Sequence, residues 1–123
     1  MTYKPAFGLP CLHITPEMIE RTYELLRVTP PYNRWKLPPG EEVEFGVMNC
    51  AFPGGDCLTE NGKTRIRIST RRIGRLHNLV EYVAHEMVHM HIQRKGIRTE
   101  HGREFKAAAK VVCRHHGFDP KLF

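Results

Sequence analysis

The spacing of apolar residues in the first part of the chain predicts one helix and one strand. Ile19, Tyr23 and Leu26 recur at helical spacing, and Thr15 is a suitable N-cap, so we expect a helix from there to about Arg27. After a proline-rich stretch, apolar and polar residues alternate over residues 43–47. This alternation is typical of a half-buried strand.

Two more strands are expected around Asn61-Gly62, the dipeptide best suited to a two-residue hairpin turn. Residues 56–60 and 63–69 form its arms. In the second arm Ile66 and Ile68 face one way, and we expect this arm to be an edge strand to which an extended peptide can add.

Two long helical patterns complete the chain, over residues 73–95 and from residue 99 or 100 to residue 116. Gly96 and Gly117 follow them directly, as helix-ending glycines do. The order predicts an α+β fold in which a small antiparallel sheet of about three strands packs with about three helices.

The composition fits one ordinary domain spanning residues 1–123, with 41% hydrophobic and 26% charged residues. No apolar run approaches the ~20 residues that span a bilayer, and the N-terminal residues lack a signal-peptide pattern. We therefore expect a soluble, cytoplasmic protein with no membrane partner, and favour a monomer.

The net charge of +6 favours an anionic partner, with nucleic acid the obvious candidate. Basic residues fall in two groups, one around the second hairpin arm and one with spacings of 3, 4 and 4 on the last helix. Two interpretations of these residues remain open: a solvated helix face, or a surface that contacts phosphates. The candidate DNA-contacting residues are Arg65, Arg67, Arg71, Arg72, Arg103, Lys106, Lys110 and Arg114.

The four cysteines show no Cys-x-x-Cys spacing. Reduced thiols are the expectation for an intracellular protein. A disulfide or a second metal shared by Cys50 and Cys57 is the alternative, because a hairpin brings them near each other.

The candidate chemistry lies in the long helix, in the run His85-Glu86-Met87-Val88-His89. Histidines four residues apart lie about 40° apart around a helix, so both imidazoles can bind one zinc ion. Glu86 is offset enough to stay out of the ligand set and to accept a proton from a water on the metal.

A catalytic zinc site usually has a third protein ligand. His91 points away from His85 on the helix, whereas His101 can fold back after Gly96 and is the better candidate. Glu100 and Glu104 remain possible carboxylate ligands. Tyr82, one turn before His85, is a weak candidate for stabilising the oxyanion, and a core aromatic is the alternative.

The motif His85-Glu86-Met87-Val88-His89, followed after eleven residues by His101-Gly102-Arg103-Glu104-Phe105, resembles the HExxH and HGxxF pattern of the SprT/Spartan family of zinc metalloproteases. Tyr32-Asn33 through Leu37-Pro38, the strand at 43–47 and Ile66-Arg67-Ile68-Ser69 match further elements of that family in the same order. The resemblance is to a minimal catalytic core without the family's zinc ribbon.

This resemblance implies a zincin-like fold, one catalytic Zn²⁺ held by His85, His89 and His101, and Glu86 as general base. It also implies an endopeptidase that cleaves DNA-associated or DNA-crosslinked proteins by Glu-assisted attack of zinc-bound water. The alternative is a nucleic-acid-binding module with a structural zinc and no proteolytic activity; a different zinc hydrolase also remains open.

Overall fold

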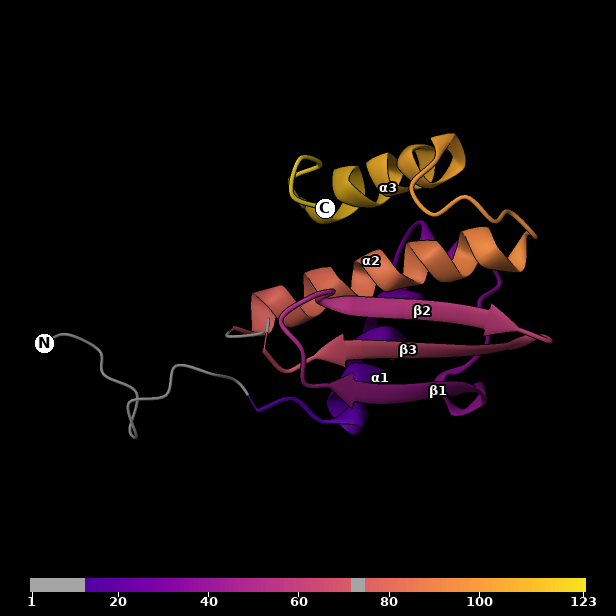
Figure 1. Ribbon diagram of the computed structural model, residues 1–123. Coiled ribbons are helices and arrows are strands. Elements are labelled where there is room, and N and C mark those ends of the chain that lie inside the picture. The colour runs from indigo at the N-terminus through magenta and orange to yellow at the C-terminus, as the bar shows by residue number, and fades with distance from the viewer. Residues whose placement is uncertain (1–12, 72–74) are drawn as a thin grey trace, which may run out of the picture.

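The computed structural model describes residues 13–71 and 75–123, in which helices pack against one small sheet (Figure 1). The order is helix, three strands, then two helices, so the expected α+β class is confirmed. Two short 3₁₀ turns, Tyr32–Arg34 and Gly40–Glu42, connect the first helix to the first strand. The main elements are α1 (Pro16–Arg27), β1 (Val43–Met48), β2 (Gly55–Glu60), β3 (Lys63–Ser69), α2 (Leu76–Arg94) and α3 (Arg103–His116).

Helix α1 forms as its sequence predicts. The Thr15 hydroxyl accepts a hydrogen bond from the Met18 N–H at 3.2 Å, which satisfies one of the free donors of the first turn. The predicted stripe of Ile19, Tyr23 and Leu26 is buried against the rest of the core. Local capping and burial of one face therefore agree.

The sheet is mixed, which corrects the expected all-antiparallel arrangement. Its strand order is β1-β3-β2, with β2 antiparallel and β1 parallel to β3. Ile66 and Ile68 of β3 are fully buried, and the central position gives this strand hydrogen-bonded neighbours on both sides. The expectation that β3 is an edge strand is therefore wrong: the two edges are β1 and β2.

The β2–β3 hairpin turns at Asn61-Gly62, as predicted. Asn61 and Gly62 have φ values of 53° and 77°, the positive values that a type I′ turn requires at both central positions. Glu60 and Lys63 are paired across this turn. The hairpin fixes the register of β2 and β3, in which Gly55 lies opposite Ile68. This end of β2 is close to Glu86, in the HExxH segment of α2.

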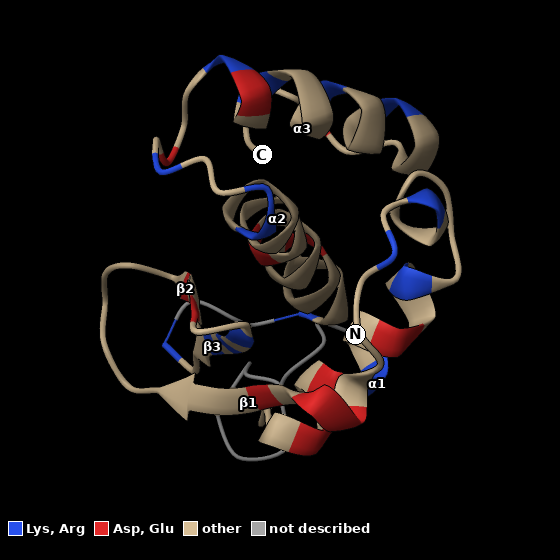
Figure 2. Ribbon diagram, turned by 90° about the vertical axis from the view of Figure 1, so that its right-hand side faces the viewer, with Lys and Arg blue, Asp and Glu red and all other residues tan. Residues whose placement is uncertain are grey.

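Helix α2 is the central element, with the sheet on one side and α3 on the other (Figures 1 and 2). Leu79, Val83, Met87 and Val88 are buried along it. It begins at Leu76 and ends at Arg94, whereas the sequence pattern suggested residues 73–95. Helix α3 begins at Arg103, later than expected, so His101 lies in the loop before it.

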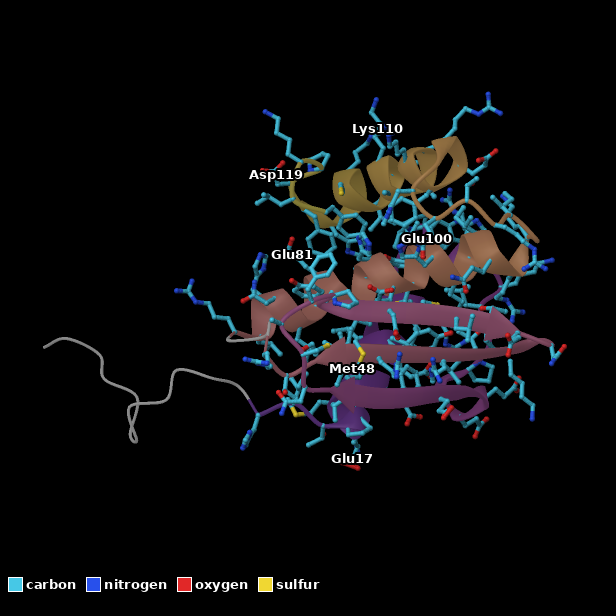
Figure 3. All side chains as sticks on the ribbon, viewed as in Figure 1. Glu17, Met48, Glu81, Glu100, Lys110 and Asp119 are labelled. Carbon is cyan, nitrogen blue, oxygen red and sulfur yellow. The ribbon has the colours of Figure 1, made fainter. Side chains whose placement is uncertain are left out.

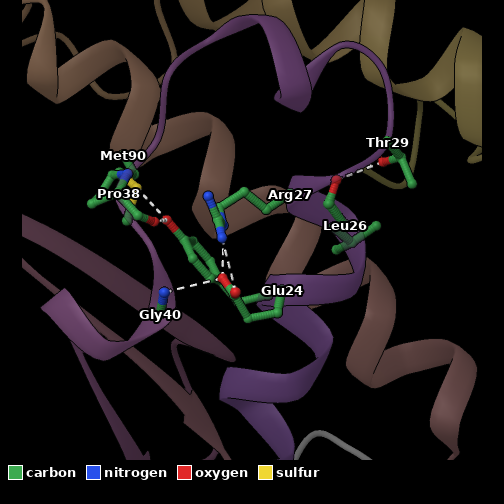
Figure 4. A network of polar contacts seen from close by, with 8 residues as sticks. Glu24, Leu26, Arg27, Thr29, Pro38, Gly40 and Met90 are labelled. Carbon is green, nitrogen blue, oxygen red and sulfur yellow. Dashed lines mark hydrogen bonds and ion pairs between the residues drawn. The ribbon is translucent and has the colours of Figure 1, made fainter.

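A polar network holds the loop between α1 and β1 (Figure 4). Glu24 forms two hydrogen bonds with the guanidinium of Arg27, at 2.7 and 2.9 Å, and accepts the Gly40 N–H at 3.0 Å. The Tyr23 hydroxyl donates to the Pro38 carbonyl at 2.6 Å. These bonds tie the proline-rich loop to α1.

Within the described part of the chain, no helix is both long and apolar enough to cross a membrane.

Candidate metal centre and catalytic cleft

Three histidines converge at the middle of α2. The Nε2 atoms of His85 and His89 lie 3.2 Å apart, and those of His89 and His101 lie 3.1 Å apart. The third side of this triangle, between His101 and His85, measures 3.4 Å. Ligands of a tetrahedral ion with metal–nitrogen bonds of 2.0–2.1 Å lie about 3.3–3.4 Å apart. The three nitrogens therefore have the spacing of ligands around a single metal ion.

The loop between α2 and α3 brings His101 to the pair on α2. Gly96, with a φ of 81°, follows the end of α2, and the chain returns to the helix before α3 begins at Arg103. Across residues 13–71 and 75–123, these three histidines are the one group of His, Cys, Asp or Glu close enough to hold a metal ion. Glu100 and Glu104 are not in that group.

His91, which is also on α2, has a separate role, as its helical position predicts. His91 stacks on Trp35, with ring centroids 3.9 Å apart and an interplanar angle of 6°. It is therefore engaged away from the cluster.

Two phenylalanines pack against the cluster, and the sequence singled out only Phe105, within the HGxxF pattern. The Phe105 ring lies 4.4 Å from that of His89 and 4.8 Å from that of His101, centroid to centroid. Phe123 packs on His85 at 5.3 Å, and its backbone hydrogen-bonds to the His85 side chain. A partner for the second ring nitrogen fixes the tautomer and leaves Nε2 free for a metal. Phe105 is the last residue of the HGxxF pattern, whereas Phe123 lies in no periodic segment.

Burial favours the neutral form of the two α2 histidines. It lowers the pKa of His85 to about 4, and it lowers the pKa of His89 to about 3. Taking an imidazolium out of water disfavours its charge, and each ring also faces the other histidines of the cluster. Both rings are therefore uncharged near neutral pH, which is the form that binds a metal.

The carboxyl group of Glu86 is almost fully buried beside this cluster. The pKa of Glu86 is raised to about 8, mainly by burial and in smaller part by the nearby charges of Asp56 and Glu100. A Cβ atom built at Gly55 would lie 3.1 Å from Oε2 of Glu86, so β2 passes very close to this carboxyl group. The group is thus a strong proton acceptor held between α2 and β2.

A cleft of about 600 Å³ opens over these residues. His85, Glu86, His89 and His101 line it, together with the loop before β2 and the C-terminal residues Leu122 and Phe123. Its wall also contains the carboxyl groups of Asp56, Glu81 and Glu100 and no Lys or Arg among the described residues. Figure 3 shows Glu100 between α2 and α3. Two of these three carboxyl groups have partners of their own, because Asp56 pairs with Arg67 and Glu81 lies 2.5 Å from the His77 imidazole.

The model of the SprT-like family matches residues 32–122 of this chain. The chain belongs to the SprT-like family. A comparison with curated proteins gives no match. The SprT-like domain has a zincin-like fold of the metallopeptidase type, which confirms the expected fold and suggests a metalloprotease-type function. The cluster of three histidines fits a metal-dependent member of this family.

Tyr82 of this SprT-like chain lines the same cleft, one turn before Glu86. Its ring lies against Gly54, where an added Cβ atom would come within 2.2 Å of the ring. The residue thus forms part of the cleft wall and packs against the loop before β2. Its role in stabilising an oxyanion remains a prediction.

The basic residues on α3 lie on the side of the helix that faces away from the body. Arg103, Lys106, Lys110 and Arg114 are all exposed. Figure 2 shows this row of basic residues along α3, and acidic residues on α1 at the opposite end of the molecule. Figure 3 shows Lys110 pointing outward. The predicted stripe exists, and its contact with DNA stays a prediction.

The other basic group has a different environment. Arg67 pairs with Asp56 across the hairpin, and Arg65 is partly buried next to Leu58 and Glu44, its partners on the two neighbouring strands. Arg71 is exposed, and Arg72 lies outside the described residues. The arginines of β3 therefore lie on the sheet face among acidic side chains.

Cys50, Cys57 and Cys113 are free thiols, as expected for reduced cysteines, and Cys11 lies outside the described residues. Cys57 is partly buried at the cleft, where its thiol lies 3.8 Å from Oε1 of Gln93. Cys50 lies against the Pro53 carbonyl instead. Among the described residues, Cys50 and Cys57 form no disulfide, and neither belongs to a group of three or more residues placed to hold a metal ion.

Proposed function

We propose that this SprT-like protein is a zinc-dependent endopeptidase that acts on DNA-associated proteins. The observation that carries the proposal is the position of Glu86: its buried carboxyl group lies beside three converging imidazole nitrogens, at the wall of an open cleft. A structural metal site is closed by four protein ligands, whereas a site with three ligands and a free cleft leaves a position for water or substrate.

The donor set fits zinc. Neutral imidazoles suit this ion, and the triangle of 3.1–3.4 Å between Nε2 atoms matches tetrahedral coordination at zinc–nitrogen distances of about 2.0–2.1 Å. When bound, zinc supplies Lewis acidity, which lowers the pKa of water and polarises a carbonyl. His85, His89 and His101 are the residues we assign to hold it.

Glu86 performs the proton transfers in this proposal. Its carboxylate accepts the proton of the attacking water as the oxygen of that water bonds to the peptide carbonyl carbon. As the C–N bond breaks, the same group returns the proton to the leaving amine. The position of Glu86 suits it to both steps, because its buried carboxyl group lies beside the three histidines at the wall of the cleft.

The surroundings of the site support a polypeptide substrate. The cleft is open and runs along the edge of β2, where an extended chain can add by backbone hydrogen bonds. The carboxyl group of Glu100 on its wall favours basic substrate residues, and segments rich in Lys and Arg are common in proteins that bind DNA. The exposed basic row on α3 begins two residues after His101, so DNA bound there would lie near the cleft.

Glu86→Gln tests the proposal, with Glu81→Gln as the matched control on the same helix and the same cleft wall. We expect Glu86→Gln to keep its zinc. Its rate of cleavage of an unfolded protein such as casein should fall by at least about 1,000-fold, with or without DNA. Glu81→Gln should retain cleavage. If Glu86→Gln cleaves as well as the unmodified protein, the mechanism is wrong. If the unmodified protein and Glu86→Gln both bind zinc and DNA but neither cleaves any substrate, the nucleic-acid-binding alternative is favoured.

A further inference from the structure

The outer edge of β2 is divided into an occupied part and an open part. In an antiparallel pair, alternate residues direct their N–H and C=O groups to the partner strand or away from it. The Ser69 N–H donates to the Gly54 carbonyl at 2.8 Å, so Gly54 is one of the residues bonded to β3. The backbone groups that face outward therefore belong to Gly55, Cys57 and Thr59.

Gln93 occupies one end of this outer edge. Its Nε2 donates to the Cys57 carbonyl at 2.9 Å, and its Oε1 accepts the Thr59 N–H at 2.8 Å. A glutamine amide has the donor and acceptor of a peptide group. Gln93 thus makes the two hydrogen bonds that one residue of an added parallel strand, or two residues of an added antiparallel strand, would make.

The open end of the edge lies at the proposed catalytic site. Gly55 keeps its outward N–H and C=O groups beside Glu86, whose Oε2 would be 3.1 Å from a Cβ atom at position 55. Residues 54–57 line the cleft. Gln93 lies one helical turn after His89 on α2, so the same helix positions the histidines and the residue that occupies the edge.

We propose that Gln93 limits how far an extended polypeptide substrate pairs with β2 on one side of the scissile bond. A substrate chain forms backbone hydrogen bonds with Gly55 and with the Cys57 N–H, and then must leave the strand because the next two groups are already bonded to Gln93. The inference rests on the proposed endopeptidase function and assigns Gln93 as a specificity-determining residue for that function.

The first test measures how cleavage depends on peptide length. A segment that the protein cleaves in casein is lengthened one residue at a time on either side of the scissile bond, and kcat/KM is measured for the unmodified protein and for Gln93→Ala. Thr64→Val is the matched control, because it removes the 2.8 Å hydrogen bond between the Thr59 and Thr64 hydroxyls and leaves the outer edge intact.

We expect the variant Gln93→Ala to gain about threefold to tenfold in kcat/KM, through KM, from residues added on one side only. The unmodified protein and Thr64→Val gain nothing from those residues. N-methylation of the added peptide amide that would bond to β2 removes the gain. Identical length dependence in all three proteins overturns the proposal.

The second test does not depend on cleavage. Hydrogen exchange of the Thr59 and Gly55 amides is followed in Glu86→Gln protein, with and without Gln93→Ala, in the presence of a long, unfolded casein peptide chosen without regard to its cleavage. We expect the Thr59 amide to exchange on the order of tenfold faster once Gln93 is replaced, and the peptide to slow it again. The peptide should slow the Gly55 amide in both proteins.

The two failures can be told apart. If the peptide protects these amides as expected but neither the unmodified protein nor Gln93→Ala cleaves it, the proposed function is wrong. The limit that Gln93 sets on pairing with β2 then still stands. If the peptide leaves the Gly55 amide unprotected in both proteins, or does not slow Thr59 in the Gln93→Ala protein, the assignment is overturned whatever the activity.

Discussion

The ring of Tyr82 lies directly over Gly54, so closely that a Cβ atom at position 54 would be 2.2 Å from its Cε1. This contact joins α2 to the residue immediately before β2. Because the next residue, Gly55, passes beside Glu86, the contact helps to set the distance between the strand edge and the proposed general base. Glycine is therefore required at position 54, because a side chain there would collide with the Tyr82 ring in the cleft wall.

Replacing Gly54 with alanine should disturb this part of the cleft. We expect Gly54→Ala to lower the free energy of unfolding by about 1–3 kcal/mol, because the new methyl group must displace the Tyr82 ring or the strand. Chemical denaturation measures the effect. Gly46→Ala is the control, since a Cβ atom there meets only the Arg67 side chain, at 3.4 Å. If Tyr82→Leu does not relieve the cost of Gly54→Ala in a double-mutant cycle, the steric explanation is wrong.

Replacing His101 should weaken zinc binding without unfolding the protein. We expect His101→Ala to raise the dissociation constant for zinc by more than about 100-fold, since the loss of a ligand exceeds the loss of an outer hydrogen-bond partner. Competition with a chromophoric chelator measures it. His115→Ala, an exposed histidine at the end of α3, serves as the control. A loss of zinc in Glu100→Ala or Glu104→Ala, with none in His101→Ala, would assign the third ligand to a carboxylate.

The Glu24 network should make stability depend on pH in a defined direction. The Arg27 guanidinium beside Glu24 holds the pKa of that carboxyl group below its usual value, with a further contribution from the Gly40 N–H. A lowered folded-state pKa stabilises the protein above the unfolded-state pKa, and this contribution is lost as the pH falls through the folded-state pKa.

We therefore expect Glu24→Gln to destabilise the protein by no more than about 1 kcal/mol at pH 7, because the pair is partly exposed to solvent. The difference from the unmodified protein should shrink towards pH 3. Denaturation curves at both pH values measure it, and Glu41→Gln, an exposed carboxylate, is the comparison. An effect of equal size at both pH values would show that charge is not its cause.

The basic row on α3 should contact DNA phosphates if the proposed partner is right. We expect Lys110→Glu to weaken double-stranded DNA binding and to reduce the slope of log K against log salt by about 1. Reversal of Arg103, Lys106, Lys110 and Arg114 together should abolish most of the salt dependence. Fluorescence anisotropy across a salt series measures both. Lys63→Glu, at the exposed β2–β3 turn, is the control; equal effects of both single variants would indicate general charge attraction only.

Several features were predictable because their cause is local. Thr15 caps α1 through a bond within four residues, and Asn61-Gly62 adopts the φ values that its turn requires. His85 and His89 share one helix face because of helical periodicity alone. The limits of α2 and α3 were less exact, since helix ends depend on caps and contacts from other segments.

The errors concern relationships between distant segments. The arms of the hairpin were right, but the sequence did not indicate that β1 would pair with β3 in parallel and leave β2 at the edge. Gln93 follows His89 at the same spacing of four that separates His85 from His89, so its position on the helix face was available from the sequence. Its bonds to Cys57 and Thr59 were not, because they join segments 34 and 36 residues apart.

The sequence by itself determined the HExxH pair, the place of Glu86 beside it on the helix, and the helical, strand and turn elements, because these follow from periodicity and nearest-neighbour chemistry. The tertiary structure decided that His101 completes the cluster, that Glu86 is buried with a raised pKa, and that β2 supplies the edge beside it. Those features arise where a helix, a strand and a loop pack together. Burial, pKa and the free edge of a sheet are properties of that packing, and no single segment contains them.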